Sequence, residues 1–435
     1  MSVFAKAKAS RSARAAWTGV ALAGVSALLL TACSTGAPAP AESEEPAADA
    51  GDALPIAEGE RDLDLKLGTI LPQSGTLAFL GPPEEAGVQL GADDVNAATD
   101  SGLTVDVTFR DSGDTTTDVA TVSVTDLLSQ DVSAIIGAAS SGVSKTVIDQ
   151  IVAAGVIQFS PANTSADFTD YDDNGLYWRT SPSDVLQGEV LGNRIASDGN
   201  STLGMIVLND AYGTGLQEFT KAAFEAAGGE VVAEALFNEG DSSFDAQIAE
   251  VTAANPDAIA LITFDQAKII VPALVGAGYP GDKLYFVDGN LADYSADFAP
   301  GLITGSKGTL PGLDVGTLGD FTDRLLEVDP ALTDYSYAAE SYDAVVLIAL
   351  AAYAANSTDG AEIAKYLQQV SGGSGDGEKV TTYEEGIALL AEGQQIDYDG
   401  PSGPVTFDEN GDPTEATIGI FEYGDDNTYT RIGDG

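Results

Sequence analysis

Two short loops of the sequence, each directly after a predicted strand, carry hydroxyl side chains. Residues 138–142 (AASSG) stand between a predicted strand at 132–136 and a predicted helix at 143–153, and residues 160–164 (SPANT) follow a predicted strand at 155–159. Hydroxyls and free N–H groups at a helix N-terminus can bind a carboxylate, which the helix dipole also favours. Ser and Thr are equally favoured as ordinary N-caps, so the residues alone leave both interpretations open.

The sequence lacks the side chains on which many enzymes depend. Its 435 residues include no histidine and one cysteine. This excludes Ser-His-Asp and Cys-His mechanisms, internal disulfides and Cys-rich zinc sites. Eighteen basic and 68 acidic residues give a formal charge of −50, which argues against nucleic-acid binding and against docking on anionic lipid through basic patches. We therefore expect a protein that is not an enzyme and needs no cofactor.

Two acidic clusters of the sequence resemble parts of a calcium-binding loop. Residues 170–175 (DYDDNG) match the first half of such a loop, but the twelfth position is Ser181 instead of the bidentate Glu that the motif requires. Residues 408–412 (DENGD) are shorter and predict a hairpin turn between strands. We expect no metal at either cluster.

The N-terminus predicts export and lipid attachment. Residues 1–14 carry four basic residues and no acid, and residues 15–32 are almost entirely apolar or small, as in a secretory signal. The segment Leu30-Thr31-Ala32-Cys33 resembles the lipobox of bacterial lipoproteins. That resemblance implies cleavage before Cys33 and a lipid anchor on the extracytoplasmic face of the cell membrane. A plain signal peptide and a single transmembrane anchor are the alternatives.

Residues 33–62 predict a disordered, acidic tether, because they are rich in Ala, Pro, Glu and Asp and show no periodicity. From Leu63 onward, short apolar segments alternate with longer amphipathic ones. This alternation predicts parallel sheets covered by helices, and about eight such units predict two α/β lobes. The expected strands are 65–71, 103–109, 132–136, 155–159, 203–208, 229–236, 257–263, 284–287 and 302–309.

The sequence also predicts where the chain crosses between the lobes. Residues 179–182 (RTSP) and 308–312 (GTLPG) are candidate crossovers. With a third crossing, we expect one lobe from 63–180 with 312–398 and the other from 181–311 with 399–435. The strongly apolar stretch 333–354 is interrupted by acids and tyrosines, so it predicts a buried core helix instead of a membrane span.

An ordered set of motifs between about 64 and 430 resembles the leucine/isoleucine/valine-binding family, which consists of substrate-binding proteins of bacterial ABC importers. The lipoprotein form is similar to that of Gram-positive bacteria, including actinobacteria. The resemblance implies the type I periplasmic-binding-protein fold, in which two Rossmann-like α/β lobes are joined by three hinge crossings and close over a ligand. The motifs are LKLGTILPQSGTLAFLGPPEEAGVQLGADDVNAA, DSGDTTTDVA, AIIGAASSGVS, VIQFSPANTSADFT, YWRTSPSDVLQG, LNDAYGTG, YFVDGN, ESYDAV and YDGPSGPVTFDENGDP.

The resemblance also implies which residues hold the carboxylate of an amino acid. In the family, two hydroxyls and several backbone groups of the two loops described above do so. The corresponding residues of this sequence are the Ser141 and Thr164 hydroxyls and the backbones of Ala139, Ala162 and Thr164, with Ser140 and Asn163 in the same loops.

The opposite lobe supplies the remaining contacts that the resemblance implies. Asp288, just before a glycine, matches the family acid that binds the ligand ammonium, and Asp265 is the alternative. Tyr212 matches a tyrosine that closes over the ligand. Leu80 stands where the family often has an aromatic residue, which predicts a wider side-chain pocket.

We therefore expect a monomeric binding protein that captures an amino acid, most of all a branched-chain one, and delivers it to ABC permease subunits. Other amino acids, short amides, urea and small aromatic acids are alternative ligands. A ligand sensor is the alternative function.

Overall fold

The computed structural model describes residues 53–435 except 315, 317 and 376, all within one compact unit, Asp49–Gly435. The predicted signal peptide, Cys33 and most of the predicted tether lie outside the described residues. Residues 53–62, also predicted as tether, instead pack on the folded chain. The Ala57 N–H donates to the Ala354 carbonyl at 2.9 Å, and the Arg61 guanidinium lies 4.5 Å from the centre of the Tyr353 ring.

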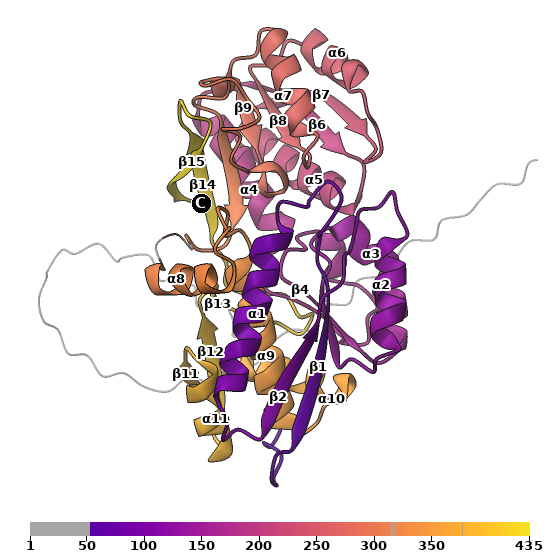
Figure 1. The fold of residues 1–435 in the computed structure, drawn as a ribbon. Coiled ribbons are helices and arrows are strands. Elements are labelled where there is room, and N and C mark those ends of the chain that lie inside the picture. The colour runs from indigo at the N-terminus through magenta and orange to yellow at the C-terminus, as the bar shows by residue number, and fades with distance from the viewer. Residues whose placement is uncertain (1–52, 315, 317, 376) are drawn as a thin grey trace, which may run out of the picture. The chain divides into compact units, whose positions relative to one another are not determined.

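A parallel five-stranded sheet, in the order β2-β1-β3-β4-β5, forms the first lobe (Figure 1). Its central strands are short and entirely buried, so they appear in the sequence as continuous apolar runs. The strands are β1 (Leu63–Ile70), β2 (Leu103–Thr108), β3 (Ala134–Gly137), β4 (Ile157–Ser160) and β5 (Tyr177–Arg179). The helices between them are α1 (Gly81–Ala97), α2 (Val119–Leu128), α3 (Ser141–Ala153) and the short η1 (Ala166–Phe168).

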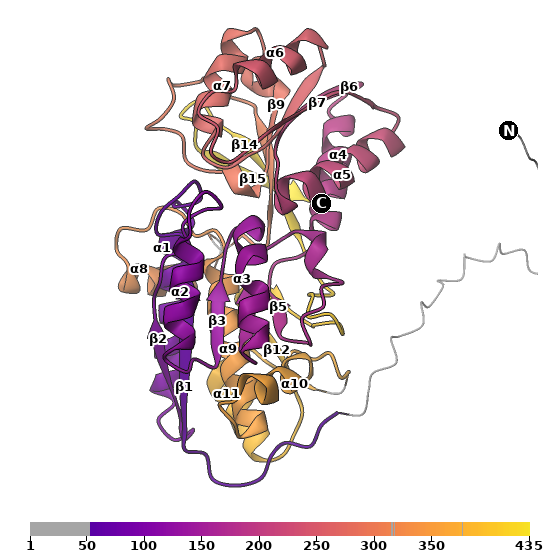
Figure 2. The same ribbon diagram turned by 90° about the vertical axis from the view of Figure 1, so that its right-hand side faces the viewer.

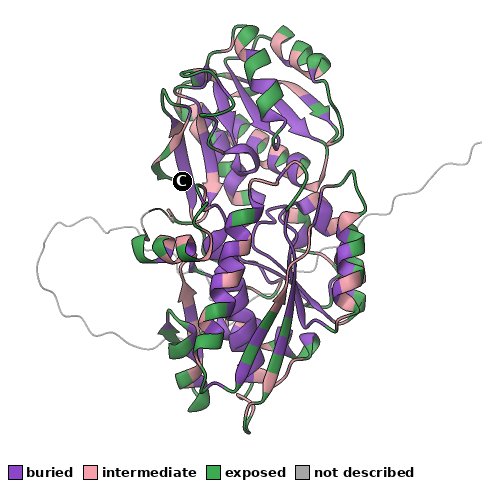
Figure 3. Ribbon diagram, viewed as in Figure 1, coloured by how far each residue is buried: buried purple, intermediate pink, exposed green. Residues whose placement is uncertain are grey.

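Helix α9 (Ala338–Ala355) belongs to the core of the first lobe, and its residues from Ala338 to Ala354 are all buried; Figure 3 colours the whole fold by burial. It is the only helix among the described residues that is long and apolar enough to cross a membrane, and 94% of it is buried inside the protein. The prediction of a core helix at 333–354 is confirmed by this burial, although the helix begins only at Ala338. The helices α8 (Gly319–Val328), α10 (Gly360–Val370) and α11 (Tyr383–Ala391) belong to the same lobe.

A seven-stranded sheet, in the order β15-β14-β10-β9-β8-β6-β7, forms the second lobe (Figure 2). The strands β7, β6, β8, β9 and β10 pair in parallel, whereas β14 pairs antiparallel with both β10 and β15. The strands are β6 (Thr202–Leu208), β7 (Glu230–Phe237), β8 (Ala258–Ile262), β9 (Leu284–Phe286), β10 (Lys307–Pro311), β14 (Ile418–Tyr423) and β15 (Tyr429–Asp434). The helices are α4 (Asp184–Ser197), α5 (Ala211–Ala226), α6 (Asp245–Ala253), α7 (Ala267–Gly276) and the short η2 (Gly281–Lys283) and η3 (Asp288–Asn290).

The strand predicted at 302–309 begins later than expected, because residues 300–305 form turns and Gly305 has a φ of 79°. The chain passes between the sheets after β5, after β10 and before β14, which supports the predicted three crossings. A small sheet of β11 (Glu378–Val380), β12 (Ile396–Gly400) and β13 (Gly403–Pro404) precedes the last crossing. Phe407 still packs in the first core, so this crossing lies beyond the predicted boundary at 398/399.

A buried carboxyl in α9 makes the stability of the first lobe pH-dependent. Asp343 accepts hydrogen bonds from the Tyr398 hydroxyl at 2.7 Å and from the Ser402 N–H at 2.8 Å. Burial nevertheless raises the pKa of Asp343 to about 7 from an ordinary 3.8. The folded chain therefore binds this proton more tightly than the unfolded chain does.

We expect the contribution of Asp343 to stability to be largest below about pH 4 and to decrease as the pH rises to about 7, by at most about 1.4 kcal/mol per pH unit. Urea unfolding of the wild type and of Asp343→Asn between these pH values measures it, because the difference between the two proteins isolates this carboxyl. A difference that stays constant with pH contradicts the prediction.

Candidate functional site

The loops at the carboxyl ends of the strands in both sheets enclose a small chamber, the place where open α/β sheets bind ligands. Its lining comes from the first lobe, the second lobe and the loop before α9: Leu77, Leu80, Ala139, Ser140, Ser141 and Ala162; Tyr212, Phe264, Asp288 and Gly289; and Tyr337. The space open to the centre of a water molecule is about 10 Å³, roughly what one water needs. Pockets for small ligands measure roughly 300–1,000 Å³, so a solute enters only when the walls move apart.

Asp288 is the polar centre of the second-lobe wall. One carboxylate oxygen accepts hydrogen bonds from the Tyr212 hydroxyl at 2.6 Å and the Gln187 amide at 2.9 Å, and the other accepts from the Tyr337 hydroxyl at 2.9 Å. Burial raises the pKa of Asp288, and these hydrogen bonds oppose that rise. Each oxygen has further lone-pair capacity, so the carboxylate can also accept a proton donor from within the chamber.

The first-lobe wall presents the N-terminus of α3. Ser140 is its N-cap and accepts from the Val143 N–H at 3.3 Å, so the capping role falls to Ser140 and not to Ser141. The Ser141 hydroxyl accepts from the Ser165 N–H at 3.3 Å, which leaves its own proton available for donation. This end of α3 therefore offers a hydroxyl proton and a positive dipole, both of which suit a carboxylate.

The side chains of Thr164 and Asn163 do not line the chamber. The Thr164 side chain is buried next to Asp184, whose pKa it lowers through a hydrogen bond. Asn163 donates to the carbonyls of Ala138 at 3.0 Å and Ala139 at 2.8 Å and accepts from the Tyr177 hydroxyl at 3.1 Å. Asn163 thus joins the two predicted binding loops to each other.

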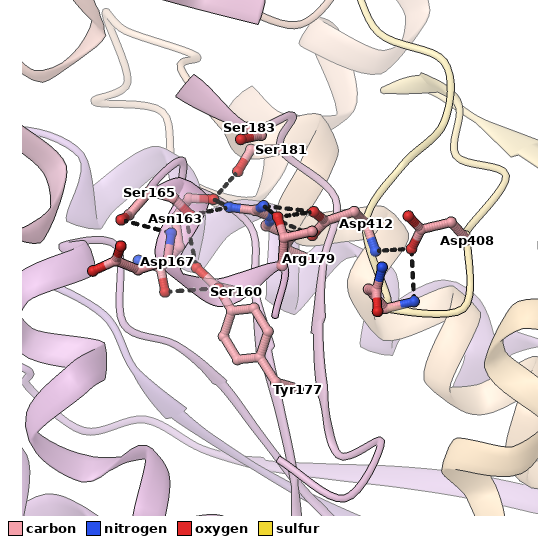
Figure 4. Close-up of polar contacts among 12 residues, drawn as sticks. Ser160, Asn163, Ser165, Asp167, Tyr177, Arg179, Ser181, Ser183, Asp408 and Asp412 are labelled. Carbon is pink, nitrogen blue, oxygen red and sulfur yellow. Dashed lines mark hydrogen bonds and ion pairs between the residues drawn. The ribbon is translucent and has the colours of Figure 1, made fainter. Parts of the chain in front are cut away.

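A buried ion pair between Arg179 and Asp412 holds the 160–165 loop in place (Figure 4). The Arg179 side chain is fully buried and meets Asp412 through two bonds, Nε–Oδ1 at 2.6 Å and Nη2–Oδ2 at 2.8 Å. Its Nη1 donates to the carbonyls of Asn163 at 3.2 Å and Ser165 at 2.8 Å. Arg179 therefore connects the 160–165 loop to the segment that precedes the third crossing.

The two acids considered for the ammonium occupy different places. Asp288 lines the chamber, whereas Asp265 lines a larger, open cavity beside it, together with Phe79 and Tyr294. The side chain that reaches the chamber from this loop is Phe264, which stacks on Tyr212 with 5.4 Å between the ring centres. The geometry therefore favours Asp288. Leu80 does line the chamber, but the wider pocket predicted there stays a prediction, because the space depends on how far the lobes separate.

The sequence did not reveal two side chains that donate hydrogen bonds to Asp288. These are Tyr337 and Gln187. Tyr337 precedes α9 with a φ of 59°, so only the folded backbone brings it to the chamber. Gln187 lies in the first turns of α4, where its spacing from the crossover 179–182 was the only signal. A third group, Asp184, is completely buried. Burial, together with the charge of Asp288, raises its pKa.

Within the described ranges, no group of three or more His, Cys, Asp or Glu side chains is arranged to hold a metal ion. At the second acidic cluster, one Asp408 oxygen accepts from the N–H groups of Asn410 at 2.8 Å and Asp412 at 3.1 Å, and Phe407 pairs with Pro413. This confirms the predicted hairpin turn at 408–412.

Comparisons with known proteins show the family of this chain. A family model described as periplasmic binding protein matches residues 64–427. The leucine-, isoleucine-, valine-, threonine- and alanine-binding protein of Pseudomonas aeruginosa is 25% identical, over 85% of this chain and 92% of its own length. The substrate-binding protein BasB of a chemotactic signal transduction system in Halobacterium salinarum is 26% identical, over 62% of this chain and 65% of its own length.

Solved structures show the same fold. The leucine-binding protein LivK of Thermotoga maritima has a TM-score of 0.71 at 20% identity, over 85% of this chain and 98% of that one. The branched-chain amino acid transporter protein LivJ of Streptococcus pneumoniae, in complex with isoleucine, has a TM-score of 0.69 at 22% identity, over 85% and 98%. A solute-binding protein of R. palustris in complex with benzoate has a TM-score of 0.67 at 19% identity, over 85% and 96%.

Proposed function

Because this chain belongs to the periplasmic binding protein family, we propose that it captures an amino acid between its two lobes. The observation that carries this proposal is that two walls of the chamber suit opposite charges. Asp288 stands on one wall, and the α3 N-terminus with Ser141 stands on the other. A zwitterion presents an ammonium to the first and a carboxylate to the second.

The side chain of the ligand meets apolar walls. Leu77, Leu80, Ala139, Ala162 and Phe264 all line the chamber and carry no polar side-chain atom. Such a lining favours an aliphatic side chain, since burying apolar surface drives binding there. Leucine, isoleucine and valine are therefore the proposed ligands, in keeping with the names of the Pseudomonas aeruginosa relative and of LivK.

The proposal extends to the cell envelope. Cys33 carries the lipid anchor, residues 33–52 tether the folded part, and the closed protein delivers its ligand to ABC permease subunits as a monomer. The sequence of the N-terminus and the family's role in solute uptake support this. We propose that the two lobes are built on 63–180 and 181–311, as predicted, and that the third crossing lies beyond Phe407 instead of at 398/399, because Phe407 packs in the first core.

The ligand is tested by a thermal-shift panel on the purified full chain, unfolded and refolded first so that carried-over ligand is lost. At roughly 100 times Kd, a ligand adds about 2.7 kcal/mol of stability, which raises Tm by several degrees for a chain of this size. We expect leucine, isoleucine and valine to raise Tm. The panel also includes the other amino acids, urea, acetamide and benzoate. A response to urea, acetamide or benzoate without any response to amino acids contradicts the zwitterion site.

A sensor is the second candidate, because the relative BasB belongs to a chemotactic signal transduction system. A transport receptor and a sensor would bind the ligand in the same chamber. They would differ in the protein that the closed form contacts, which is a permease for the receptor and a signalling protein for the sensor. Uptake of labelled leucine separates them, since deletion of a transport receptor abolishes uptake and deletion of a sensor does not.

A further inference from the structure

Beside the chamber, an acid of the second lobe bonds to two hydroxyl residues of the first. Glu239 follows β7, and its Oε1 accepts from the Thr76 hydroxyl at 2.5 Å. Its Oε2 accepts from the Thr115 N–H at 3.0 Å and also from the Thr115 hydroxyl. None of these three residues lines the chamber. The bonds therefore join the lobes without contacting the space that a solute occupies.

A second acid of the same lobe faces the first lobe nearby. Asp210 is the N-cap of α5, and its Oδ1 accepts from the Gly213 N–H at 2.7 Å. Its Oδ2 is buried without a partner in the described part of the chain and faces the first turn of α3. A Cβ atom placed on Gly142 would lie 2.8 Å from this oxygen. A side chain at this position would therefore displace the Asp210 carboxylate or keep the lobes farther apart.

We propose that Glu239 and Asp210 form a latch that holds the two lobes closed and so sets how long a bound solute stays. The part that concerns solute retention rests on the proposed function. Opening must break three hydrogen bonds to the Glu239 carboxylate, and bonds to a charged group are stronger than neutral ones. It must also expose the Asp210 side chain, which is buried in the closed form. Because the latch residues do not touch the solute, their loss changes retention equally for every ligand.

The latch has a pH dependence with a definite sign. Burial raises the pKa of Asp210 to about 7, and the neighbouring charge of Glu239 adds to the rise. The charge of Asp210 in turn raises the pKa of Asp184 in α4; on α3, Lys145 is paired with Asp167. Opening exposes the Asp210 carboxyl and returns its pKa toward 3.8, so the closed form binds the proton more tightly. Closure is therefore favoured as the pH falls from 7 towards 4.

The test compares Glu239→Ala and Gly142→Ala with the wild type and with Glu230→Ala, an exposed acid at the start of β7 that serves as control. Two quantities are measured on the full chain: the radius of gyration by small-angle X-ray scattering, and the dissociation rates of leucine, isoleucine and valine by stopped flow. We expect both latch variants to enlarge the radius of gyration. We also expect them to speed dissociation by about tenfold or more, equally for the three ligands.

Glu239→Gln keeps one acceptor oxygen and should recover part of the loss. Asp210→Asn should flatten the change of the leucine dissociation rate between pH 5 and 7 relative to the wild type. The latch is refuted if Glu239→Ala and Gly142→Ala both match Glu230→Ala in radius of gyration and in rate. If the wild type binds no amino acid, the proposed function fails, and the radius of gyration still decides the latch.

Discussion

Replacing Asp288 by Asn will abolish most of the affinity for amino acids and leave the fold intact. The Asn retains an acceptor for Tyr212 and Gln187, and its amide can donate to the Tyr337 hydroxyl, which now donates to Asp288 at 2.9 Å. The negative charge that faces the ligand ammonium is lost. Removing one partner of a buried charge pair costs about 2–5 kcal/mol of binding, which corresponds to roughly 30- to several-thousand-fold in Kd.

Asp265→Asn is the matched control, because it makes the same chemical change in the adjacent loop outside the chamber. We expect its Kd for leucine to stay within a few-fold of the wild type. Isothermal titration of both variants, with unfolding curves to verify the fold, makes the comparison. If Asp265→Asn loses binding and Asp288→Asn does not, the assignment of the ammonium partner is reversed.

Replacing Asp412 by Ala will cause the largest loss of stability among single changes near the site. The Arg179 side chain is 0% exposed and would keep its charge with no carboxylate opposite. Breaking a buried pair in this way costs about 3–5 kcal/mol. Because Arg179 also holds the carbonyls of Asn163 and Ser165, the loop of the first-lobe wall should loosen, and leucine affinity should fall with stability.

Urea unfolding measures the effect, with Asp126→Ala as control. Asp126 also pairs with an arginine, Arg110, at 2.7 Å, but both side chains are more than one third exposed, and such pairs contribute about 0–1 kcal/mol. Replacing both buried partners, as Arg179→Met with Asp412→Leu, should restore much of the stability. Equal losses for Asp412→Ala and Asp126→Ala would show that burial of the pair contributes nothing.

The alternation of strands and helices could be predicted because parallel strands buried on both faces appear as short apolar runs. The 65–71 segment became β1 and the 257–263 segment became β8, each shifted by a residue or two. The loops after such strands point to the ligand-binding edge by the topology of open sheets. For this reason the loops at 138–142 and 160–164 could be placed at that edge from the sequence, whereas Asp288 was assigned from the resemblance to the family.

Contacts between distant segments could not be predicted. Tyr337 reaches Asp288 from a loop that belongs to the other lobe, and no local pattern marks a tyrosine for that role. The late start of β10 was missed for a similar reason. The apolar residues at 302–303 pack beside the turn at Gly305, and the Ser306 hydroxyl bonds to the Gly281 carbonyl at 2.7 Å, so tertiary contacts decide where the strand begins.

The order in which the chain builds its lobes governs how it can be synthesised. The first core is completed by Phe407, which packs on Phe159 and Trp178 with ring centres 5.9 and 5.2 Å apart. The second sheet needs β14 beside β10. Domains usually fold one after another as they leave the ribosome, but here neither can close until the final segments have been translated. Both lobes are therefore completed late, after the point at which a lobe made of one contiguous segment could already fold.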